Sequence, residues 1–289
     1  MKSTFGTRAE PLSKHTSLHI GGPAEYYVRI TSERDLVGAI KVARENELPV
    51  FVLGAGTNLL VADQGIKGFV IHNDWAETSV DGTTITAASG TPMASVAAVA
   101  ARNGILGLEW MATVPGTVGG AVHGNAGAFG KETADDIVDA ELMDLNGRTW
   151  TASQDELGFA YRTSVLQGTP TVVVRARFRG GAGDRATAVK RIKEMANERM
   201  SKQPLAQPNT GSIFRNPPGD HAGRLIEAAG LKGATQGGAM VSTKHANFIV
   251  NIGDASATDV RTLMELAQRT VKEKFGIDLV PEVELVGEW

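Results

Sequence analysis

The chain has 289 residues, of which 42% are hydrophobic and 21% are charged, and its formal net charge is −3. These values are typical of a soluble globular protein and exclude a strongly basic surface for nucleic acid or an anionic membrane. The absence of cysteine excludes disulfides, thiolate metal sites and a flavin attached through sulfur. With no long apolar stretch and no apolar segment near the N-terminus, we expect no membrane insertion, no signal peptide and a cytoplasmic location.

The first half of the chain mixes short strand patterns with helical ones. Residues 1–22 have no clear pattern, and His15 and His19 lack the Glu of a zinc-protease helix, so we expect no metal. Apolar and alternating runs predict strands at 24–30, 49–53, 69–72 and 84–88. Apolar residues at helical spacing predict helices at 36–46 and 93–103.

The second half continues the same mixture. Strands are predicted at 138–144, 149–152, 171–178, 248–252 and 277–286. Helices are predicted at 186–199, 221–229 and 258–275, and the glycine-rich residues 180–184 are interpreted as a linker. Mixed elements without a regular strand–helix alternation indicate an α+β fold.

The first motif that points to a ligand is LGAGTNLL at residues 53–60. Its two glycines let successive main-chain N–H groups converge into a nest that holds a phosphate, and Thr57 and Asn58 add side-chain donors. It is not the Rossmann fingerprint, because the third glycine is missing. A simple turn between two strands would have the same sequence features and remains an alternative.

The second motif is the glycine-rich, almost uncharged stretch at residues 104–130. Interior glycines disfavour an ordinary helix, and the apolar residues between them argue against a flexible linker. We therefore expect ordered, non-helical backbone that lies close against a flat or large ligand. A set of tight turns between strands is the alternative.

Several segments then occur in a fixed order along nearly the whole chain. They are LGAGTNLL, VPGTVGGAVHGNAGAFG, YRTSVL, NTGSIFRNP, AAGLKG, VSTKHANFIVN and PEVELVG. Together they resemble the UDP-N-acetylenolpyruvoylglucosamine reductase family, often called MurB. The resemblance implies a two-subdomain FAD-binding fold of the vanillyl-alcohol-oxidase (PCMH-like) type and a C-terminal α+β domain for substrate. We expect FAD subdomains at residues 1–62 and 63–184 and the substrate domain at 185–289.

The resemblance implies FAD held without a covalent bond and NADPH as co-substrate. Thr57 and Asn58 follow Gly56 directly, where some relatives in the wider superfamily carry a flavin-linked His. The implied FAD-binding residues are Gly54, Ala55, Gly56, Thr57, Asn58, Pro115, Gly116, Thr117, Gly119, Gly120, Asn125, Ala126 and Gly127.

The same resemblance implies three catalytic residues. Arg162 would face the substrate carboxylate, where a guanidinium supplies a permanent bidentate cation. Glu282 would lie near that carboxylate, although Glu284 has the same strand parity and is a competing assignment. Ser212 would deliver a proton to C2, which requires an activating partner because serine is a poor acid. Without the resemblance, each residue has a structural alternative. Arg162 could pair with a nearby acidic residue, Glu282 could face solvent from a strand, and Ser212 could be an ordinary turn residue.

The implied substrate-binding residues are Tyr161, Arg215, Asn216, Arg224, Lys244 and His245. The alternative for His245 is a buried histidine whose hydrogen bonds are all made within the protein. The chain has only three tyrosines and resembles the shorter subclass, which lacks a Tyr-bearing loop over the uridine end.

The implied reaction is NADPH-dependent reduction, through FAD, of UDP-N-acetylglucosamine enolpyruvate to UDP-N-acetylmuramate in peptidoglycan precursor synthesis. We expect a monomer whose partner is this UDP-sugar. An FAD-linked alcohol or hydroxy-acid oxidase of the same superfamily, and a non-catalytic nucleotide-binding protein, are the alternatives.

Overall fold

The computed structural model describes residues 6–289. Helices and strands are mixed throughout, as expected for an α+β fold, and the chain divides into two compact units. The first unit contains Gly6, Tyr27–Ala55 and Gly68–Arg199, and the second contains Thr7–Tyr26, Gly56–Lys67 and Met200–Trp289. Both units are therefore assembled from segments that are far apart in the sequence.

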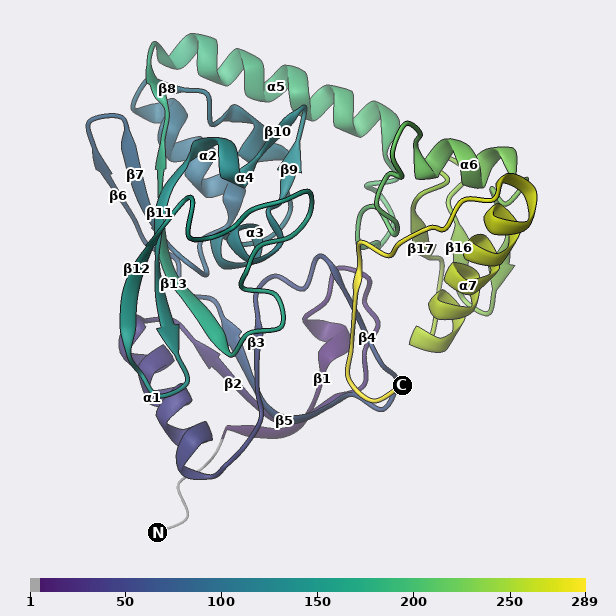
Figure 1. The fold of residues 1–289 in the computed structure, drawn as a ribbon, viewed down its shortest axis with the longest axis horizontal. Coiled ribbons are helices and arrows are strands. Elements are labelled where there is room, and N and C mark those ends of the chain that lie inside the picture. The colour runs from purple at the N-terminus through teal and green to yellow at the C-terminus, as the bar shows by residue number, and fades with distance from the viewer. Residues whose placement is uncertain (1–5) are drawn as a thin grey trace. The chain divides into compact units, whose positions relative to one another are not determined.

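The first unit is built on an antiparallel five-stranded sheet of order β12-β11-β13-β7-β6 (Figure 1). Alternation of buried and exposed residues along these strands turns one face toward the core. A register shift between Glu141 and Leu142 marks an irregularity between β11 and β13. The strands are β6 (Thr78–Asp81), β7 (Thr84–Ala88), β11 (Ile137–Asp144), β12 (Thr149–Ser153) and β13 (Thr171–Arg179).

Short helices complete the core of this unit. They are α2 (Met93–Arg102), η2 (Glu109–Thr113), α3 (Val118–Gly124) and α4 (Thr133–Asp136). Trp110 is buried among them and donates its indole N–H to Asp136 at 2.7 Å, so its one polar atom is satisfied. Two-stranded pieces flank the helices: β8 (Ile105–Leu106) with β14 (Gly181–Ala182), and β9 (Gly127–Ala128) with β10 (Lys131–Glu132).

The expectation that residues 104–130 contain no helix is wrong for α3. This helix includes Gly119 and Gly120, although each interior glycine costs about 1 kcal/mol relative to Ala. Tertiary packing explains the exception: a Cβ on Gly119 would lie 3.0 Å from the Ser89 Cβ, and the Gly119 N–H donates to the Ser89 carbonyl at 2.8 Å. The missing side chain lets the helix approach the end of β7.

A second sheet has the order β1-β2-β5-β3. Its strands are β1 (Thr7–Pro11), β2 (Pro23–Ile30), β5 (Ile66–Asn73) and β3 (Val50–Leu53). Strands β3 and β5 are parallel, with Leu53 opposite His72. Helix α1 (Glu33–Glu45) precedes β3, and its N-cap is Ser32, whose hydroxyl accepts the Asp35 N–H.

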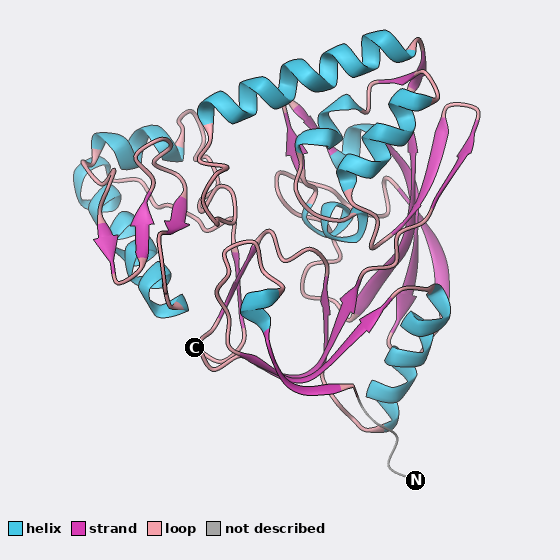
Figure 2. Ribbon diagram, turned by 180° about the vertical axis from the view of Figure 1, so that it is seen from behind, coloured by secondary structure: helices cyan, strands magenta, loops and turns pink. Residues whose placement is uncertain are grey.

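The second unit contains a three-stranded sheet with α7 packed along it (Figure 2). Its elements are η1 (Leu12–Lys14), α6 (Ala222–Ala228), β15 (Thr235–Gln236), β16 (Ala239–Val241), β17 (Ile249–Asn251) and α7 (Ala257–Phe275). Helix α7 starts at a capping box of Ser256 and Asp259 and ends at Gly276, which has φ +71°. Leu18, Ile20 and Leu60 join the core of this unit from early parts of the chain.

Two further predictions differ from the structure. The expected strand at 277–286 is reduced to β18 (Glu284–Val286), which pairs in parallel with β4 (Leu59–Val61), because Pro281 cannot donate to a ladder. The glycine-rich residues 180–184 include β14 rather than forming only a linker, and α5 (Arg185–Lys202) follows them.

Within residues 6–289, no helix combines the length and the apolar character needed to cross a membrane.

Candidate active site

The segment Gly54–Asn58 presents main-chain donors that the protein itself does not use. Within the described part of the chain, the N–H groups of Gly54, Ala55, Gly56 and Asn58 donate to no protein acceptor. Gly56 has φ +59°, and Ala55 and Asn58 are exposed. Unused N–H groups beside a left-handed glycine are the chemistry of an anion-binding nest, so this segment fits a pyrophosphate.

The two glycines of this segment have no room for a side chain. A Cβ on Gly54 would lie 2.6 Å from the Thr117 Oγ1, and one on Gly56 would lie 2.2 Å from the His15 carbonyl oxygen. Thr117 is buried and caps α3, so it has little freedom to move. Glycine is therefore required at both positions by close packing, and at Gly56 by backbone conformation as well.

We expect Gly54→Ala to destabilise the protein by about 1–3 kcal/mol, because the new methyl group overlaps a buried hydroxyl. The same change should weaken FAD binding. Gly38→Ala is the matched control: Gly38 is exposed in α1, with nothing near its added Cβ. Thermal unfolding and FAD titration of both variants measure the difference, and equal behaviour would contradict the packing argument.

The segment Pro115–Gly127 is held closely against the end of the five-stranded sheet. Gly116 has φ +122°, and its carbonyl accepts the Met93 N–H at 3.0 Å. A Cβ on Gly127 would lie 2.3 Å from the Lys131 carbonyl oxygen. Pro115 and Gly120 are exposed, and Ala126 is half-buried. The predicted flavin segment is thus a rigid piece of backbone that is exposed in part.

Asn125 has a different environment from the other predicted FAD residues. It is fully buried with φ +46°, its amide N–H donates to the Ala160 carbonyl at 2.9 Å, and its amide oxygen accepts the Ala134 N–H at 3.0 Å. Both ends of the side chain are engaged inside the protein. Asn125 therefore shapes the segment through internal bonds, while its contact with FAD stays a prediction.

Arg162 belongs to the first unit and follows the exposed Tyr161. It has φ +58°, its guanidinium donates to the Gly127 carbonyl at 3.1 Å, and it lies 5.2 Å from the Tyr161 ring centroid. This hydrogen bond connects Arg162, which is predicted to bind the substrate carboxylate, to the segment that is predicted to bind the flavin. A bulky residue at positive φ is uncommon, and such strain clusters at functional sites.

Ser212 and Glu282 lie on segments that pair through the backbone in the second unit. Phe214 and Pro281 form an antiparallel bridge, and the Ile213 carbonyl accepts the Glu282 N–H at 2.8 Å. Both side chains are half-buried. Residues 70 positions apart in the chain are therefore neighbours across one strand pair, as a shared site requires.

The segment around Ser212 holds polar atoms without partners. The Thr210 hydroxyl and the Arg215 Nε are buried and make no hydrogen bond to any of the described residues, 6–289. The Ser212 hydroxyl also has no partner within residues 6–289. Because buried polar atoms are almost always satisfied, these atoms mark a place that a ligand or water completes.

Asn58 connects the nest to the segment that carries Glu282. Its amide N–H donates to the Glu282 carbonyl at 3.1 Å, and its own carbonyl accepts the Glu284 N–H at 3.0 Å. Both bonds lie within the second unit. The structure thus brings together Asn58, Ser212 and Glu282.

The remaining predicted substrate residues have protein partners. Asn216 accepts the Ala222 N–H at the start of α6, and Lys244 donates to the Met200 carbonyl at 2.7 Å. Arg224 is exposed and pairs with Asp220, and this hydrogen bonding lowers the pKa of Asp220 to about 2. Substrate binding by these residues stays a prediction.

His245 has the environment of an interior histidine. Its Nδ1 accepts the Asn247 N–H at 3.2 Å, and its ring contacts Phe248 edge-on. Burial, with a smaller contribution from Lys232, lowers the pKa of His245 below its ordinary value. The ring is therefore neutral near pH 7 and supplies no cation for an anionic ligand.

Two polar residues that the sequence patterns did not single out hold the Ser212 segment in place. Asn247 is buried and exchanges side-chain hydrogen bonds with the main chain of Phe214 at 3.0 and 2.8 Å. Ser17 donates its hydroxyl to the Asn209 carbonyl at 2.7 Å. Asn247 could have been found from the sequence, because a polar Asn stands between the apolar residues of KHANFIV. Ser17 could not, because its segment has no helical or strand pattern.

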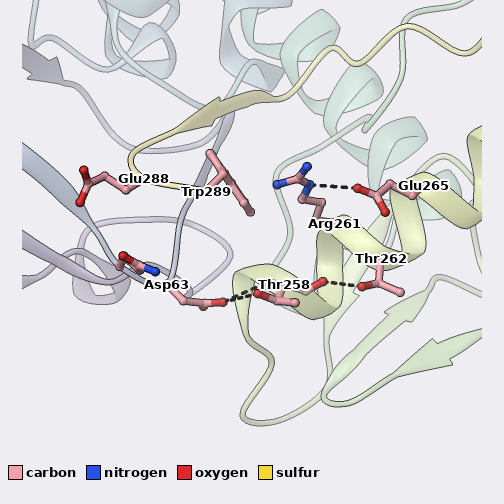
Figure 3. Close-up of a pocket in the computed structure, with 8 residues that line it drawn as sticks. Asp63, Thr258, Arg261, Thr262, Glu265, Glu288 and Trp289 are labelled. Carbon is pink, nitrogen blue, oxygen red and sulfur yellow. Dashed lines mark hydrogen bonds and ion pairs between the residues drawn. The ribbon is translucent and has the colours of Figure 1, made fainter.

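A cavity of about 330 Å³ in the second unit lies apart from these predicted residues, none of which lines it (Figure 3). Its charged groups are already paired: Asp63 accepts the Ala257 and Thr258 N–H groups at the start of α7, and Arg261 pairs with Glu265 and lies over Trp289. This arrangement anchors α7. The lining residues are Asp63, Gln64, Thr258, Arg261, Thr262, Glu265, Glu288 and Trp289.

Comparisons with known proteins agree with the geometry. A model of an FAD binding domain matches residues 24–153, and a model of the C-terminal domain of UDP-N-acetylenolpyruvoylglucosamine reductase matches residues 203–286. The chain therefore contains an FAD-binding domain followed by a second domain, which confirms the predicted α+β fold. The second match includes both Ser212 and Glu282.

Similar proteins cover nearly the whole chain. UDP-N-acetylenolpyruvoylglucosamine reductase 2 of Symbiobacterium thermophilum is 45% identical over 97% of this chain and 92% of its own length. The enzyme of Caldanaerobacter subterraneus subsp. tengcongensis is 43% identical over 96% and 93%. The crystal structure of MurB from Thermus caldophilus superposes with a TM-score of 0.82 at 36% identity, covering 96% of this chain and 98% of that one. The chain belongs to the UDP-N-acetylenolpyruvoylglucosamine reductase family.

Proposed function

We propose that the protein reduces the enolpyruvyl group of UDP-N-acetylglucosamine enolpyruvate to give UDP-N-acetylmuramate, a step of peptidoglycan precursor synthesis. The observation that carries the proposal is the pairing of the Ser212 and Glu282 segments inside the region that matches the family's C-terminal domain. The unpartnered polar atoms beside Ser212 support a ligand there.

FAD fits the residues that would hold it. The N–H groups of Gly54, Ala55, Gly56 and Asn58 donate to no acceptor within residues 6–289 and suit the pyrophosphate. The close-packed glycines of Pro115–Gly127 leave main chain uncovered for the flavin ring. When bound there, FAD would supply the redox chemistry of the reaction, the transfer of hydride from NADPH to C3 of the enolpyruvyl group. No cysteine is present to attach it through sulfur, and we propose that it is bound without a covalent link.

Arg162 is proposed to bind the substrate carboxylate. Hydride addition at C3 builds negative charge at C2, and this charge spreads into the carboxylate. A guanidinium remains charged at any working pH and donates two parallel hydrogen bonds to a carboxylate. Arg162 therefore stabilises the transition state more than the ground state, which is the requirement for a gain in rate.

Glu282 and Ser212 are proposed to complete the reaction at C2. Glu282 is half-buried and follows the Pro281 that bridges to Phe214, and its carboxyl is proposed to donate a hydrogen bond to the charge that develops. The Ser212 hydroxyl has no partner among residues 6–289, and we propose that it gives its proton to C2. One proton at C2 balances the hydride at C3.

The anaerobic absorption spectrum of the purified protein tests this function. We expect a bound flavin that denaturation releases, bleaching on addition of NADPH, and recovery of the flavin colour on addition of the enolpyruvyl nucleotide. Rapid recovery in air with no enolpyruvyl nucleotide would instead favour an oxidase. Purified protein with no flavin would favour a nucleotide-binding protein without activity.

Glu282 and Glu284 are distinguished by a matched pair of variants. We expect Glu282→Gln to slow reoxidation of the flavin by the enolpyruvyl nucleotide by about tenfold to 100-fold, because an amide N–H is a weaker hydrogen-bond donor to the developing charge than a carboxylic acid. Glu284→Gln should remain near the wild-type rate. Stopped-flow absorbance measures both, and the reverse order would assign the role to Glu284.

The finer assignments rest on the same family relationship. We propose that Arg215, Asn216, Arg224, Lys244, His245 and Tyr161 lie around the sugar nucleotide, and that the three-part division at residues 62 and 184 separates the two FAD subdomains from the substrate domain. We further propose that the protein is a cytoplasmic monomer.

A further inference from the structure

Ser17 connects two parts of the second unit that are far apart in the sequence. Its N–H donates to the Gly56 carbonyl at 3.0 Å, and its hydroxyl donates to the Asn209 carbonyl at 2.7 Å. The hydroxyl is also 3.4 Å from the Gly56 oxygen. One residue thus touches the predicted pyrophosphate nest and the NTGS segment that leads to Ser212.

Asn209 begins the turn that presents Ser212. Its amide oxygen accepts the Gly211 N–H at 2.9 Å, and its amide N–H donates to the Gln207 carbonyl at 2.8 Å. Gly211 follows with φ +79°, which any other residue adopts only with strain. The turn is internally rigid, so its position depends on what holds Asn209.

The two ends of this segment are fixed by different residues. After Ser212, the Ile213 N–H donates to the Asn247 carbonyl at 2.9 Å, and Asn247 also bonds the main chain of Phe214. Before Ser212, Asn209 forms a main-chain bridge with Val250, and its carbonyl accepts the Ser17 hydroxyl. A shift of about 1 Å in a reacting group costs as much as 100-fold in rate, so both attachments matter for proton delivery.

We infer that Ser17 is a positioning residue for Ser212. By bonding both Gly56 and Asn209, Ser17 fixes the position of the turn that carries Ser212 relative to the nest. This inference rests on the proposed function of Ser212 as proton donor. In Ser17→Ala the main-chain bond to Gly56 remains, and the hydroxyl's bond to Asn209 and its longer contact with the Gly56 carbonyl are lost. The defect should therefore appear in the proton-transfer half of the reaction and not in FAD binding.

The test uses the full-length protein with FAD bound and separates the two half-reactions by anaerobic stopped-flow. In Ser17→Ala we expect FAD affinity and the rate of flavin reduction by NADPH to stay within about twofold of wild type. Reoxidation by the enolpyruvyl nucleotide should slow by roughly fivefold, the effect of one hydrogen bond. Its solvent deuterium isotope effect should rise, because proton delivery limits the rate more.

Two further variants make the outcome decisive. Ser17→Thr keeps a hydroxyl and should restore reoxidation, whereas Ser13→Ala, in the same segment, removes a hydroxyl with no partner within residues 6–289 and should change nothing. Equal slowing of both half-reactions in Ser17→Ala, or no slowing at all, overturns the inference. If the enolpyruvyl nucleotide did not reoxidise the reduced flavin of the wild-type protein, the proposed function itself would be overturned.

Discussion

Ser212→Ala should leave reduction of the flavin by NADPH nearly intact and slow its reoxidation by the enolpyruvyl nucleotide by about 100-fold to 10,000-fold. The hydroxyl has no partner in the described chain, so its loss removes a proton donor without breaking a protein hydrogen bond. Anaerobic stopped-flow absorbance follows each half separately, and thermal unfolding should show a stability within about 0.5 kcal/mol of wild type.

Ser212→Cys is the informative companion, because a thiol is a better acid than an alcohol and retains a proton at neutral pH. We expect it to react faster than Ser212→Ala. If Ser212→Ala slowed both half-reactions to the same extent, Ser212 would be needed for flavin placement and not for proton transfer.

Arg162→Ala should lower kcat/KM for the enolpyruvyl nucleotide by about 100-fold or more, because the proposed bidentate contact between the guanidinium and the substrate carboxylate would be lost. Arg162→Lys should recover only part of this loss, since an ammonium keeps the charge but not the planar pair of donors. Steady-state kinetics with the nucleotide varied, together with flavin reduction by NADPH, measure both effects.

Arg148→Lys is the matched control, because Arg148 is exposed in the hairpin between β11 and β12 and has no proposed role. It should match wild type. Full activity in Arg162→Lys would show that charge alone suffices and would remove the bidentate role. The guanidinium also donates to the Gly127 carbonyl, so flavin content is measured for every Arg162 variant.

The sequence predicted the family, and through it the α+β fold and the FAD-binding domain, because ordered motifs such as LGAGTNLL and NTGSIFRNP are specific as a set. It could not predict α3. Gly119 and Gly120 oppose a helix by propensity, and only their packing against Ser89 reverses that preference. Tertiary contacts of this kind leave no trace in local periodicity.

The candidate site was only partly accessible to sequence reasoning. Glu282 and Ser212 were proposed from separate motifs, but their pairing depends on the bridge between Phe214 and Pro281, which no local pattern encodes. Residues that act through main-chain contacts are harder still to find. Ser17 looks like any serine in an irregular segment until its partner, almost 200 positions away, is seen beside it.

The second unit is completed by early segments of the chain, and this has a consequence for its biogenesis. Leu18, Ile20 and Leu60 belong to its core, and β4 pairs with β18 near the other end of the sequence. During translation these early residues are synthesised long before the C-terminal residues with which they pack and pair. A fragment that starts at Met200 would lack them and would expose apolar surface to solvent, so residues 200–289 are not a module that recombination transfers alone.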